Sequence, residues 1–455
     1  MSFEGRSFVG TPATAPGPVG PQMLKAFSAI RRNPLDYLAT VWREYGDVVQ
    51  FPIPRPPSYL VNDPEAVRRV LVANARNYGK ATIQYRSLSL VTGDGLLVAD
   101  TDDWRRQRPL VQPAFHHETL DLVVGHVQRS VDRLMTQWQS LPAGAVVDLD
   151  AAMMTVGLEV VGHALFGTDL SADAHRLAEA TLSALDVVVA RARVPITPPA
   201  WVPTPANRTL RRSVGELDAA VMRMLQARRR GSSDGPGDML DLLMAARDDT
   251  GVGLSEQQIR DQIVTFIVAG HETVASSLTW AWALLAENPE IQERLQAESD
   301  DVLGGRPASF ADYGRLAFAR AVVDEALRLY PPAWLVTRRS VGPDELANRS
   351  LPANALVILS PWLLHRHPQV WSDPEIFDPD RFLDGRADRT AFIPFGAGPR
   401  QCIGRDFAYV ESVLLLSMVA GRFRVAFPAG VTRPAAEPLV TLRPVGGLPM
   451  HVHTR

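Results

Sequence analysis

The residues best suited to chemistry lie in segment 395–404, which reads Phe-Gly-Ala-Gly-Pro-Arg-Gln-Cys-Ile-Gly. It contains Cys402, the one cysteine of the chain, so no intramolecular disulfide can form. Two glycines and a proline before the cysteine allow a tight turn that presents backbone amides to the sulfur. A helix predicted to begin just after Cys402 directs its positive end at the sulfur and is expected to lower the pKa of the thiol. Such a thiolate serves as a nucleophile or a metal ligand, whereas a lone cysteine in other surroundings is more often a buried, inert thiol.

An acid and an alcohol stand side by side in a long apolar segment. Glu272 and Thr273 follow two small residues, Ala269 and Gly270. Thr273 comes three residues after Gly270 and therefore shares a face of the predicted helix with it. A hydroxyl beside a carboxyl group can order water and pass protons. The alternatives are a threonine that bonds back to a helix carbonyl and a glutamate in a buried salt bridge.

Five motifs, in order along the chain, together resemble the cytochrome P450 family. Segment 395–404 resembles the haem-binding loop of that family, matched at Phe395, Gly398, Arg400, Cys402 and Gly404. The others are similar to a Trp-x-x-x-Arg helix, an oxygen-activating stretch, a Glu-x-x-Arg pair and an Arg-bearing loop, at Trp104–Arg108, Ala269–Thr273, Glu325–Arg328 and Phe377–Phe382. The resemblance covers the chain from about residue 30 to about residue 450.

The resemblance implies a mainly α fold with small β-sheet regions, in one large helix-rich unit whose long central helix passes over the haem. It implies haem b as cofactor, with Cys402 as the metal ligand. A thiolate on haem iron donates electron density that favours cleavage of the O–O bond. Ala269 and Gly270 are expected to let haem and dioxygen approach the helix backbone, and Glu272 and Thr273 to act as the catalytic pair.

The family's other site residues carry over in the same way. Partners for the haem propionates are expected at Trp104, Arg108, Arg338 and Arg400, with Arg338 favoured over its neighbour Arg339. A buried charge cluster of structural rather than catalytic role is expected from Glu325, Arg328 and Arg381. His365 is expected to pack or to form hydrogen bonds near this region, not to bind a metal.

The predicted substrate pocket is apolar, which suits a terpenoid, fatty acid, steroid or polyketide. Ordinary core packing is the alternative for each of its residues. They come from segments 83–88 and 185–189, the central helix with Ile263, segment 333–336 and Leu439–Val440; the predicted walls are Ile83, Tyr85, Leu88, Val188, Phe266, Ile267, Trp334, Val336 and Val440.

The expected reaction is insertion of one oxygen atom from O2, with electrons from NAD(P)H supplied through separate redox partners. No Gly-x-Gly-x-x-Gly follows a predicted strand, so no nucleotide site is expected in the chain. Soluble bacterial members of the family usually use a ferredoxin and a ferredoxin reductase. Arg105, Arg106 and Arg405 are hypothesised to form a basic patch for an acidic ferredoxin on the Cys402 side of the haem.

Enzymes and proteins of other classes fit less well. The sequence around Cys402 has neither local signature of the cysteine hydrolases. A zinc peptidase of the His-Glu-x-x-His type is excluded because Ala275 stands where the second histidine would be. A peroxide-using haem–thiolate enzyme would not need the proton-delivering Glu272–Thr273 pair. A non-enzymatic haem carrier or sensor stays open, although a sensor would need an output module.

The elements that position these residues are mostly helices. Ser255 to Gln258 has the form of a capping box and opens the long central helix, which Pro289 stops after Asn288. A second helix is predicted at about 316–330, before Pro331 and Pro332. Short strands are predicted at 48–51 and 59–61, and small β regions near 40–65 and 335–360. Residues 1–25 are predicted as a Pro- and Gly-rich lead-in to one catalytic domain, 26–455.

Composition narrows the protein class. The chain has 455 residues, 46% of them hydrophobic, and a net charge of −3, so nucleic acid is not an expected partner. The N-terminus has no basic start followed by an apolar stretch, so no signal peptide is expected. The apolar segment 263–286 contains His271 and Glu272 and is interpreted as a buried helix rather than a membrane span. A cytoplasmic monomer without a membrane anchor is expected.

Overall fold

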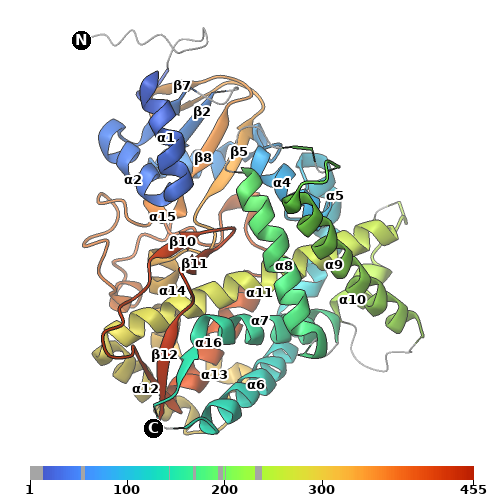
Figure 1. The fold of residues 1–455 in the computed structure, drawn as a ribbon, viewed down its shortest axis with the longest axis vertical. Helices are drawn as coiled ribbons and strands as arrows, with labels where there is room; N and C mark the ends of the chain where they lie inside the picture. The colour runs from blue at the N-terminus through green and yellow to red at the C-terminus, as the bar shows by residue number, and fades with distance from the viewer. Residues whose placement is uncertain are drawn as a thin grey trace.

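One long helix organises the fold. The computed structural model describes residues 14–52, 57–142, 144–167, 171–192, 198–199, 201–230, 238–248 and 250–455. Helix α11 (Glu256–Glu287) crosses the molecule between a sheet-containing part and a helical part (Figure 1). Its capping box is confirmed: the Ser255 hydroxyl accepts from the Gln258 amide at 3.2 Å, and the Gln258 side chain accepts from the Ser255 amide at 2.9 Å. The predicted central helix and its end before Pro289 are therefore confirmed.

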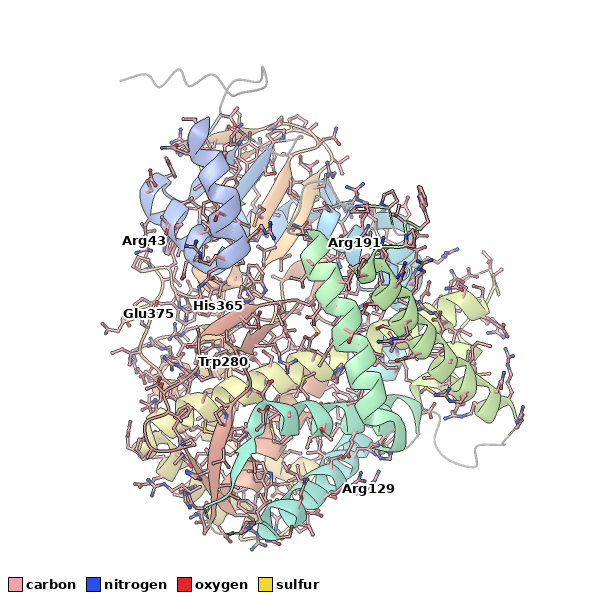
Figure 2. All side chains as sticks on the ribbon, viewed as in Figure 1. Arg43, Arg129, Arg191, Trp280, His365 and Glu375 are labelled. Carbon is pink, nitrogen blue, oxygen red and sulfur yellow. The ribbon has the colours of Figure 1, made fainter. Side chains whose placement is uncertain are left out.

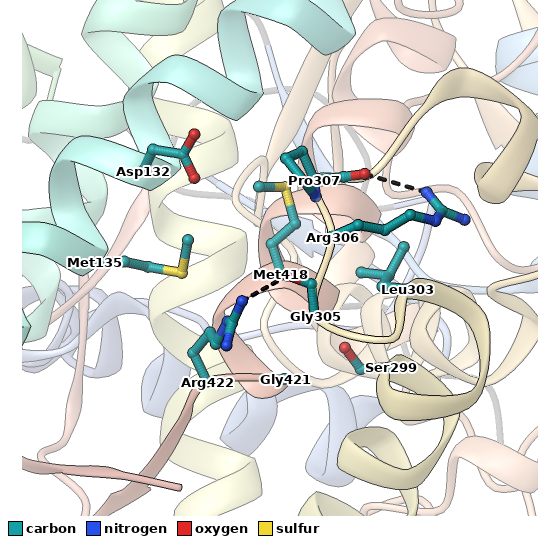
Figure 3. A pocket seen from close by; sticks show the side chains of 10 residues that line it. All are labelled: Asp132, Met135, Ser299, Leu303, Gly305, Arg306, Pro307, Met418, Gly421 and Arg422. Carbon is teal, nitrogen blue, oxygen red and sulfur yellow. Dashed lines mark hydrogen bonds between the residues drawn. The ribbon is translucent and has the colours of Figure 1, made fainter.

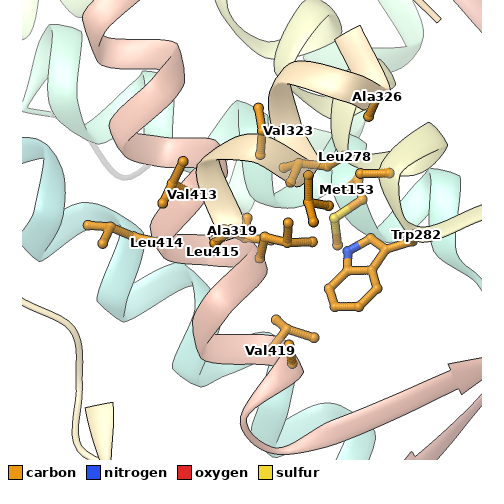
Figure 4. Packing of buried hydrophobic residues seen from close by; sticks show 14 of the residues in the cluster. Met153, Leu278, Trp282, Ala319, Val323, Ala326, Val413, Leu414, Leu415 and Val419 are labelled. Atoms are coloured by element: carbon orange, nitrogen blue, oxygen red, sulfur yellow. The ribbon is translucent and has the colours of Figure 1, made fainter. Parts of the chain in front are cut away.

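Helix α11 packs against α7 (Leu149–Phe166), α14 (Ala317–Leu329) and α16 (Arg405–Ala420), and α6 (His117–Gln139) packs in turn on α7 and α16. Figure 4 shows Met153 of α7, Leu278 and Trp282 of α11, Val323 of α14 and Val413 of α16 meeting in the core. All five side chains are buried. Burial stabilises the fold by about 1.5–3 kcal/mol for each large apolar side chain. This packing therefore fixes α14, which carries Glu325 and Arg328 of the charge cluster, and α16, which follows Cys402.

A five-stranded sheet lies on the other side of α11 (Figure 1). Its order is β1 (Val48–Phe51), β2 (Ser58–Val61), β8 (Leu356–Leu359), β5 (Val336–Ser340) and β3 (Tyr78–Gly79). Only the β2–β8 pair within this sheet is parallel. The predicted strands at 48–51 and 59–61 and the β regions near 40–65 and 335–360 are confirmed, so the mainly α fold with small sheets is correct.

The remaining elements connect these two parts. The helices are α1 (Pro21–Arg32), α2 (Pro34–Tyr45), α3 (Pro64–Arg68), η1 (Arg69–Ala73), η2 (Ala75–Asn77), α4 (Ile83–Thr92), α5 (Thr101–Val111), η3 (Gln112–Phe115), α8 (Ser171–Ala192), α9 (Pro205–Arg230), α10 (Met239–Ala245), α12 (Pro289–Leu303), α13 (Phe310–Tyr313), α15 (Pro361–Leu364), η4 (Pro379–Phe382) and η5 (Gly398–Arg400). The strands are β4 (Val146–Asp148), β6 (Asp344–Leu346), β7 (Arg349–Leu351), β9 (Phe423–Ala426), β10 (Ala436–Pro438), β11 (Leu442–Pro444) and β12 (Pro449–Thr454).

Two expectations about the ends of elements need comment. Helix α1 begins at Pro21, inside the segment 1–25 predicted as a lead-in, because proline is well suited to the first turn of a helix. Residues 1–13 lie outside the described part of the chain. Within the described part, no helix is long and apolar enough to span a membrane, so segment 263–286 is a buried helix as predicted.

Candidate active site

The loop that carries Cys402 is closed by its own backbone. The Cys402 amide donates to the Phe395 carbonyl at 2.9 Å, and the Gln401 amide donates to the Gly398 carbonyl at 3.0 Å. Gly398 has a φ of +67°, and a Cβ there would lie 2.1 Å from the carbonyl oxygen of Leu71 in η1. Glycine is therefore required at this position for two reasons: the backbone is left-handed, and a second backbone approaches closely.

The environment of the sulfur differs from the sequence prediction. Cys402 keeps exposed surface, yet protein atoms crowd around its sulfur, and burial raises the pKa of the thiol. The Gly404 amide, which bonds to the sulfur, and the guanidinium of Arg108 act in the opposite direction on this pKa. Helix α16 begins at Arg405, as expected for a helix just after Cys402. The Gly404 amide at the start of this helix lowers the thiol pKa in the expected direction, but desolvation of the sulfur is the larger effect, so the net pKa is raised rather than lowered.

Cationic side chains gather beside this loop. Arg400 donates to the Ala99 carbonyl at 2.6 Å and lies over the Trp104 ring, 4.5 Å from its centre. Arg108 donates to the Gln401 carbonyl at 3.1 Å. Arg338 is buried and donates to the hydroxyl of Tyr85 at 3.1 Å. The structure thus brings together the four residues expected to hold the propionates.

Arg339, the alternative to Arg338 as a propionate partner, does not join this group of cationic side chains. Its Nε donates to the Ala81 carbonyl at 2.7 Å, and its Nη1 donates to the Asn354 carbonyl at 3.2 Å. Alternate residues of β5 point to opposite faces of the sheet, which separates the two arginines.

Lys80 completes the cluster and was missed by sequence analysis. Its ammonium is buried and donates to the Leu97 carbonyl at 2.6 Å. Burial, followed by repulsion from Arg338, Arg400 and Arg108, lowers the pKa of Lys80 well below its ordinary value. Lys80 is one of two lysines in an arginine-rich sequence, and this rarity was the available signal. We call Lys80, Arg108, Arg338 and Arg400 the cationic cluster.

The cationic cluster fits a haem. Among the described residues that act on the pKa of Lys80, Asp100 is the one carboxylate, and its oxygen lies 3.8 Å from Arg400. Four cations facing one carboxylate are an unfavourable arrangement unless further anions join them. The two propionates of a haem would supply those anions, and the thiol of Cys402 beside the cluster supplies an iron ligand.

The small residues of α11 have two different roles. Thr273 donates its hydroxyl to the Ala269 carbonyl at 2.7 Å, the back-bonded arrangement that was weighed as an alternative. A Cβ on Gly270 would lie 2.9 Å from the side chain of Val161 in α7. The small size of Gly270 is therefore also required by the packing of α7 against α11, and its contact with haem, like that of Ala269, stays a prediction.

Glu272 is buried, with one oxygen held and the other free of partners. Its Oε1 accepts from the hydroxyl of Thr441 at 3.0 Å, while no described residue bonds to Oε2. Burial raises the pKa of Glu272 to about 7, against the opposing effects of Arg443 and Thr441. The alternative of a buried direct salt bridge is not what the structure has. A carboxyl group that titrates near neutral pH can both take up and release protons.

The predicted buried charge cluster is present. Glu325 receives two hydrogen bonds from Arg328, at 2.7 and 2.8 Å, and one from Arg381 at 3.0 Å. All three residues are buried. His365, labelled in Figure 2, lies beside them with its Nδ1 3.2 Å from the Arg328 carbonyl. Its Nε2 accepts from the Ile393 amide at 2.9 Å, so His365 forms hydrogen bonds as predicted.

An apolar cluster joins most of the predicted pocket residues to the flanks of Cys402. Leu88 of α4, Val188 of α8, and Ile263, Phe266 and Ile267 of α11 form its buried part. Partly buried side chains packed against it are Tyr85, also of α4, and Val440, Ile403 and Phe407 from two other segments. We call this the α4–α8–α11 cluster.

Three predicted pocket residues do not belong to the α4–α8–α11 cluster. Val336 packs against the sheet, and Trp334 packs against the core beneath α1 and α2, where its indole donates to the Leu439 carbonyl at 2.9 Å. Ile83 is half-buried at the start of α4. Their role in binding stays a prediction. Sequence patterning could not separate them because apolar residues on either side of one strand look alike.

The arginines proposed as a basic patch are exposed but paired. Arg105 lies 3.1 Å from Asp102, Arg106 lies 3.6 Å from Asp103, and Arg405 lies 2.9 Å from Asp406. Arg405 is among the charges that act on the Cys402 sulfur, and Arg105 among those that act on Arg400. Arg105 and Arg405 therefore lie near the Cys402 loop, whereas Arg106 acts on Asp248, and neighbouring acids reduce the positive charge that was expected there.

A separate cavity of about 150 Å³ lies away from these residues (Figure 3). Its walls come from α6, α12 and the end of α16, and none of the predicted site residues lines it. Arg306 and Arg422 at its rim already bond to protein oxygens, at Asp312 and Gly305. It is not a candidate for the active site.

Comparisons with known proteins agree with the geometry. The model of the cytochrome P450 family matches residues 15–448. The chain is 39% identical to cyclooctatin synthase of Streptomyces melanosporofaciens, over 92% of this chain and 91% of the relative. It is 36% identical to cyclooctat-9-en-7-ol 5-monooxygenase of the same organism, over 93% and 91%, and 34% identical to pentalenene oxygenase of Streptomyces avermitilis, over 93% and 93%. The chain therefore belongs to the cytochrome P450 family, as a monooxygenase with a haem–thiolate cofactor.

Proposed function

We propose that this monooxygenase oxidises a terpenoid in secondary metabolism, with Cys402 as the thiolate ligand and Glu272 and Thr273 as the proton-delivering pair. The observation that carries the substrate class is the α4–α8–α11 cluster, because Phe266, Ile267 and Val188 belong to one apolar cluster against which Ile403 and Phe407, on the C-terminal side of Cys402, are packed. An apolar wall beside the reacting centre binds hydrocarbon by burying its surface. The relatives named for cyclooctatin and pentalenene, both terpenoids, support the same class.

When bound, the haem would supply the redox chemistry by which two electrons from the redox partner and two protons convert one atom of dioxygen to water while the other enters the substrate. The chain's own contribution is to hold the cofactor, to bind the substrate and to supply protons. The cationic cluster would hold the propionates, and Cys402 the iron. These contacts would orient the cofactor.

Protons would reach the site through Glu272 and Thr273. The Thr273 hydroxyl donates to the Ala269 carbonyl, so its oxygen keeps lone pairs that can accept from a water molecule. Glu272, with a pKa of about 7, is about equally populated in its acid and base forms near neutral pH. Glu272 can therefore reload the water held by Thr273 after each proton is used.

The electron donor we propose is a ferredoxin with its reductase. Arg105 and Arg405 lie near the Cys402 loop, and with the neighbouring Arg106 they would bring an acidic partner to the thiolate side of the haem. Their acidic neighbours weaken this surface, so its contribution to association is expected to be moderate.

The test of the proposed function is the coupling of electrons to product. Thr273→Ala should still consume reduced cofactor with a terpenoid substrate but release more peroxide and less product. Glu272→Gln keeps the shape of the side chain but removes the proton source. Turnover itself should therefore slow by about 10²–10⁴-fold, the usual contribution of a positioned proton-transfer group. Product per reduced cofactor and peroxide are measured in parallel. Unchanged coupling in Thr273→Ala and unchanged rate in Glu272→Gln would show that protons arrive by another route.

A further inference from the structure

The hairpin formed by β10 and β11 is bonded directly to the central helix. The Leu442 carbonyl accepts from the Ser276 hydroxyl at 2.6 Å and from the Trp280 indole at 3.0 Å. Trp280, which Figure 2 labels, stacks on Tyr330 with ring centres 4.0 Å apart. These contacts fix the hairpin in one position along α11, about one to two turns from Glu272.

Two side chains of the hairpin face Glu272. Thr441 donates to Glu272 Oε1 at 3.0 Å. Arg443 donates to Asp150 of α7 at 2.5 Å, and Asp150 also accepts from Thr279 of α11 at 3.2 Å. Arg443 is therefore held by a carboxylate that is itself tied to the same helix as Glu272.

Three buried polar atoms in this region have no partner among the described residues: Glu272 Oε2, Arg443 Nε and His271 Nε2. Each such atom costs about 1–3 kcal/mol if it stays unpaired. Arg443 acts electrostatically on both Glu272 and His271, so the three side chains lie close to one another. A buried water that bonds to two or more of them would satisfy the unpaired groups.

We propose that the β10–β11 hairpin positions the proton donor: Thr441 fixes one oxygen of Glu272, and Arg443, anchored by Asp150, binds the other through a water. This inference rests on the proposed function, in which Glu272 delivers protons. It adds two positioning residues from the C-terminal part of the chain. Val440, the residue before Thr441, packs against the α4–α8–α11 cluster, so the same hairpin contacts the apolar cluster and the acid.

The charges around Glu272 oppose one another. Arg443 and Thr441 favour its carboxylate, whereas burial and the carboxylates of Asp186 on α8 and Asp150 on α7 favour its acid form. His271, the adjacent imidazole on α11, is buried with a pKa of about 4 and stays neutral near pH 7. Removing the charge of Arg443 should thus raise the pKa of Glu272, and removing the charge of Asp186 should lower it.

The experiment measures the titration of Glu272 in the haem-loaded protein by infrared difference spectroscopy of its protonated carboxyl band. The band is identified by its loss in Glu272→Gln. Arg443→Gln and Thr441→Val should move the midpoint upwards, Arg443→Gln by about one pH unit, a tenfold change in the proton affinity of the carboxyl. Asp186→Asn should move it downwards. Arg443→Lys and Thr441→Ser keep the charge or the hydroxyl and should titrate near the native protein.

The exposed Arg424→Gln on β9 is the matched control for loss of one arginine and should leave the midpoint in place. The pH above which product per reduced cofactor declines should follow the infrared midpoint in every variant. Identical midpoints in the native protein, Arg443→Gln and Thr441→Val would overturn the inference. If the midpoints shift as expected while Glu272→Gln keeps full coupled turnover, the hairpin still sets the titration of Glu272 and the proposed proton route fails instead.

Discussion

Arg328 and His365 bind to each other's main chains. The guanidinium of Arg328 donates to the His365 carbonyl at 2.9 Å, and the Nδ1 of His365 donates to the Arg328 carbonyl at 3.2 Å. The other ring nitrogen accepts from the Ile393 amide, two residues before the Cys402 loop begins. Both bonds require neutral imidazole with its proton on Nδ1. The buried charge cluster is thereby connected to the loop that carries the cysteine.

Replacing His365 tests this connection through the pH dependence of stability. Burial and the neighbouring Arg328 lower the pKa of His365 from 6.5 to about 3. Below pH 6.5 the unfolded chain therefore binds a proton that the folded chain does not, so stability falls as pH decreases. His365→Phe should lower stability at pH 7 and flatten the acid dependence by up to about 1.4 kcal/mol per pH unit. Denaturant unfolding between neutral and mildly acidic pH measures both effects; an unchanged slope would contradict this account of His365.

The charge cluster should be costly to break. Glu325→Ala leaves Arg328 and Arg381 buried without their carboxylate, at a cost of about 3–5 kcal/mol, and little haem-loaded protein is expected. Arg229→Ala is the control, because Arg229 pairs with Glu256 at an exposed position and such pairs contribute about 0–1 kcal/mol. Yield, haem content and unfolding midpoint are compared. Equal losses of yield, haem content and stability in the two variants would show that the buried cluster stabilises the fold no more than an exposed ion pair does.

The parts of this site that could be predicted from the sequence are those defined by residues close together in the chain. The capping box of α11, its proline stop and the motif around Cys402 depend on neighbours within a few residues, and each is where it was predicted. The missed features depend on contacts between distant segments. Lys80 meets Arg400, and Thr441 meets Glu272, only after the chain has folded. The packing demand on Gly270 was missed because its close neighbour, Val161, belongs to another helix.

The Cys402 loop offers a pair of glycines with different demands. Gly396 and Gly398 have φ values of +68° and +67°, but a Cβ would meet the Leu71 backbone only at Gly398. Gly396→Ala should cost about 1–2 kcal/mol, the strain of a left-handed residue. Gly398→Ala adds a backbone clash at 2.1 Å and should displace the loop from η1, with loss of haem. Thermal unfolding and haem content are measured for both variants. Equal unfolding temperatures and haem contents in the two would show that η1 can move away from the loop.

Electron transfer should respond to charge near the cysteine loop. Reversing Arg105 and Arg106 to Glu replaces two positive charges by two negative ones, on a surface where Asp102 and Asp103 already offset the two arginines. Ferredoxin-driven reduction should slow at low salt, substrate binding should stay the same, and the difference should shrink as salt rises. Stopped-flow reduction at several ionic strengths measures this. Equal rates at low salt would place the docking surface elsewhere.

The central claim is that Cys402 holds the haem as a thiolate, and the reduced carbon monoxide spectrum tests it most directly. Cys402 is the one cysteine of the chain, so no other residue can supply a thiolate. The native protein should show the red-shifted carbonyl band that gives the family its name, and Cys402→Ser, reconstituted with haem, should lack it. A native carbonyl spectrum of the histidine-ligated type, or a red-shifted band that persists in Cys402→Ser, would contradict the account.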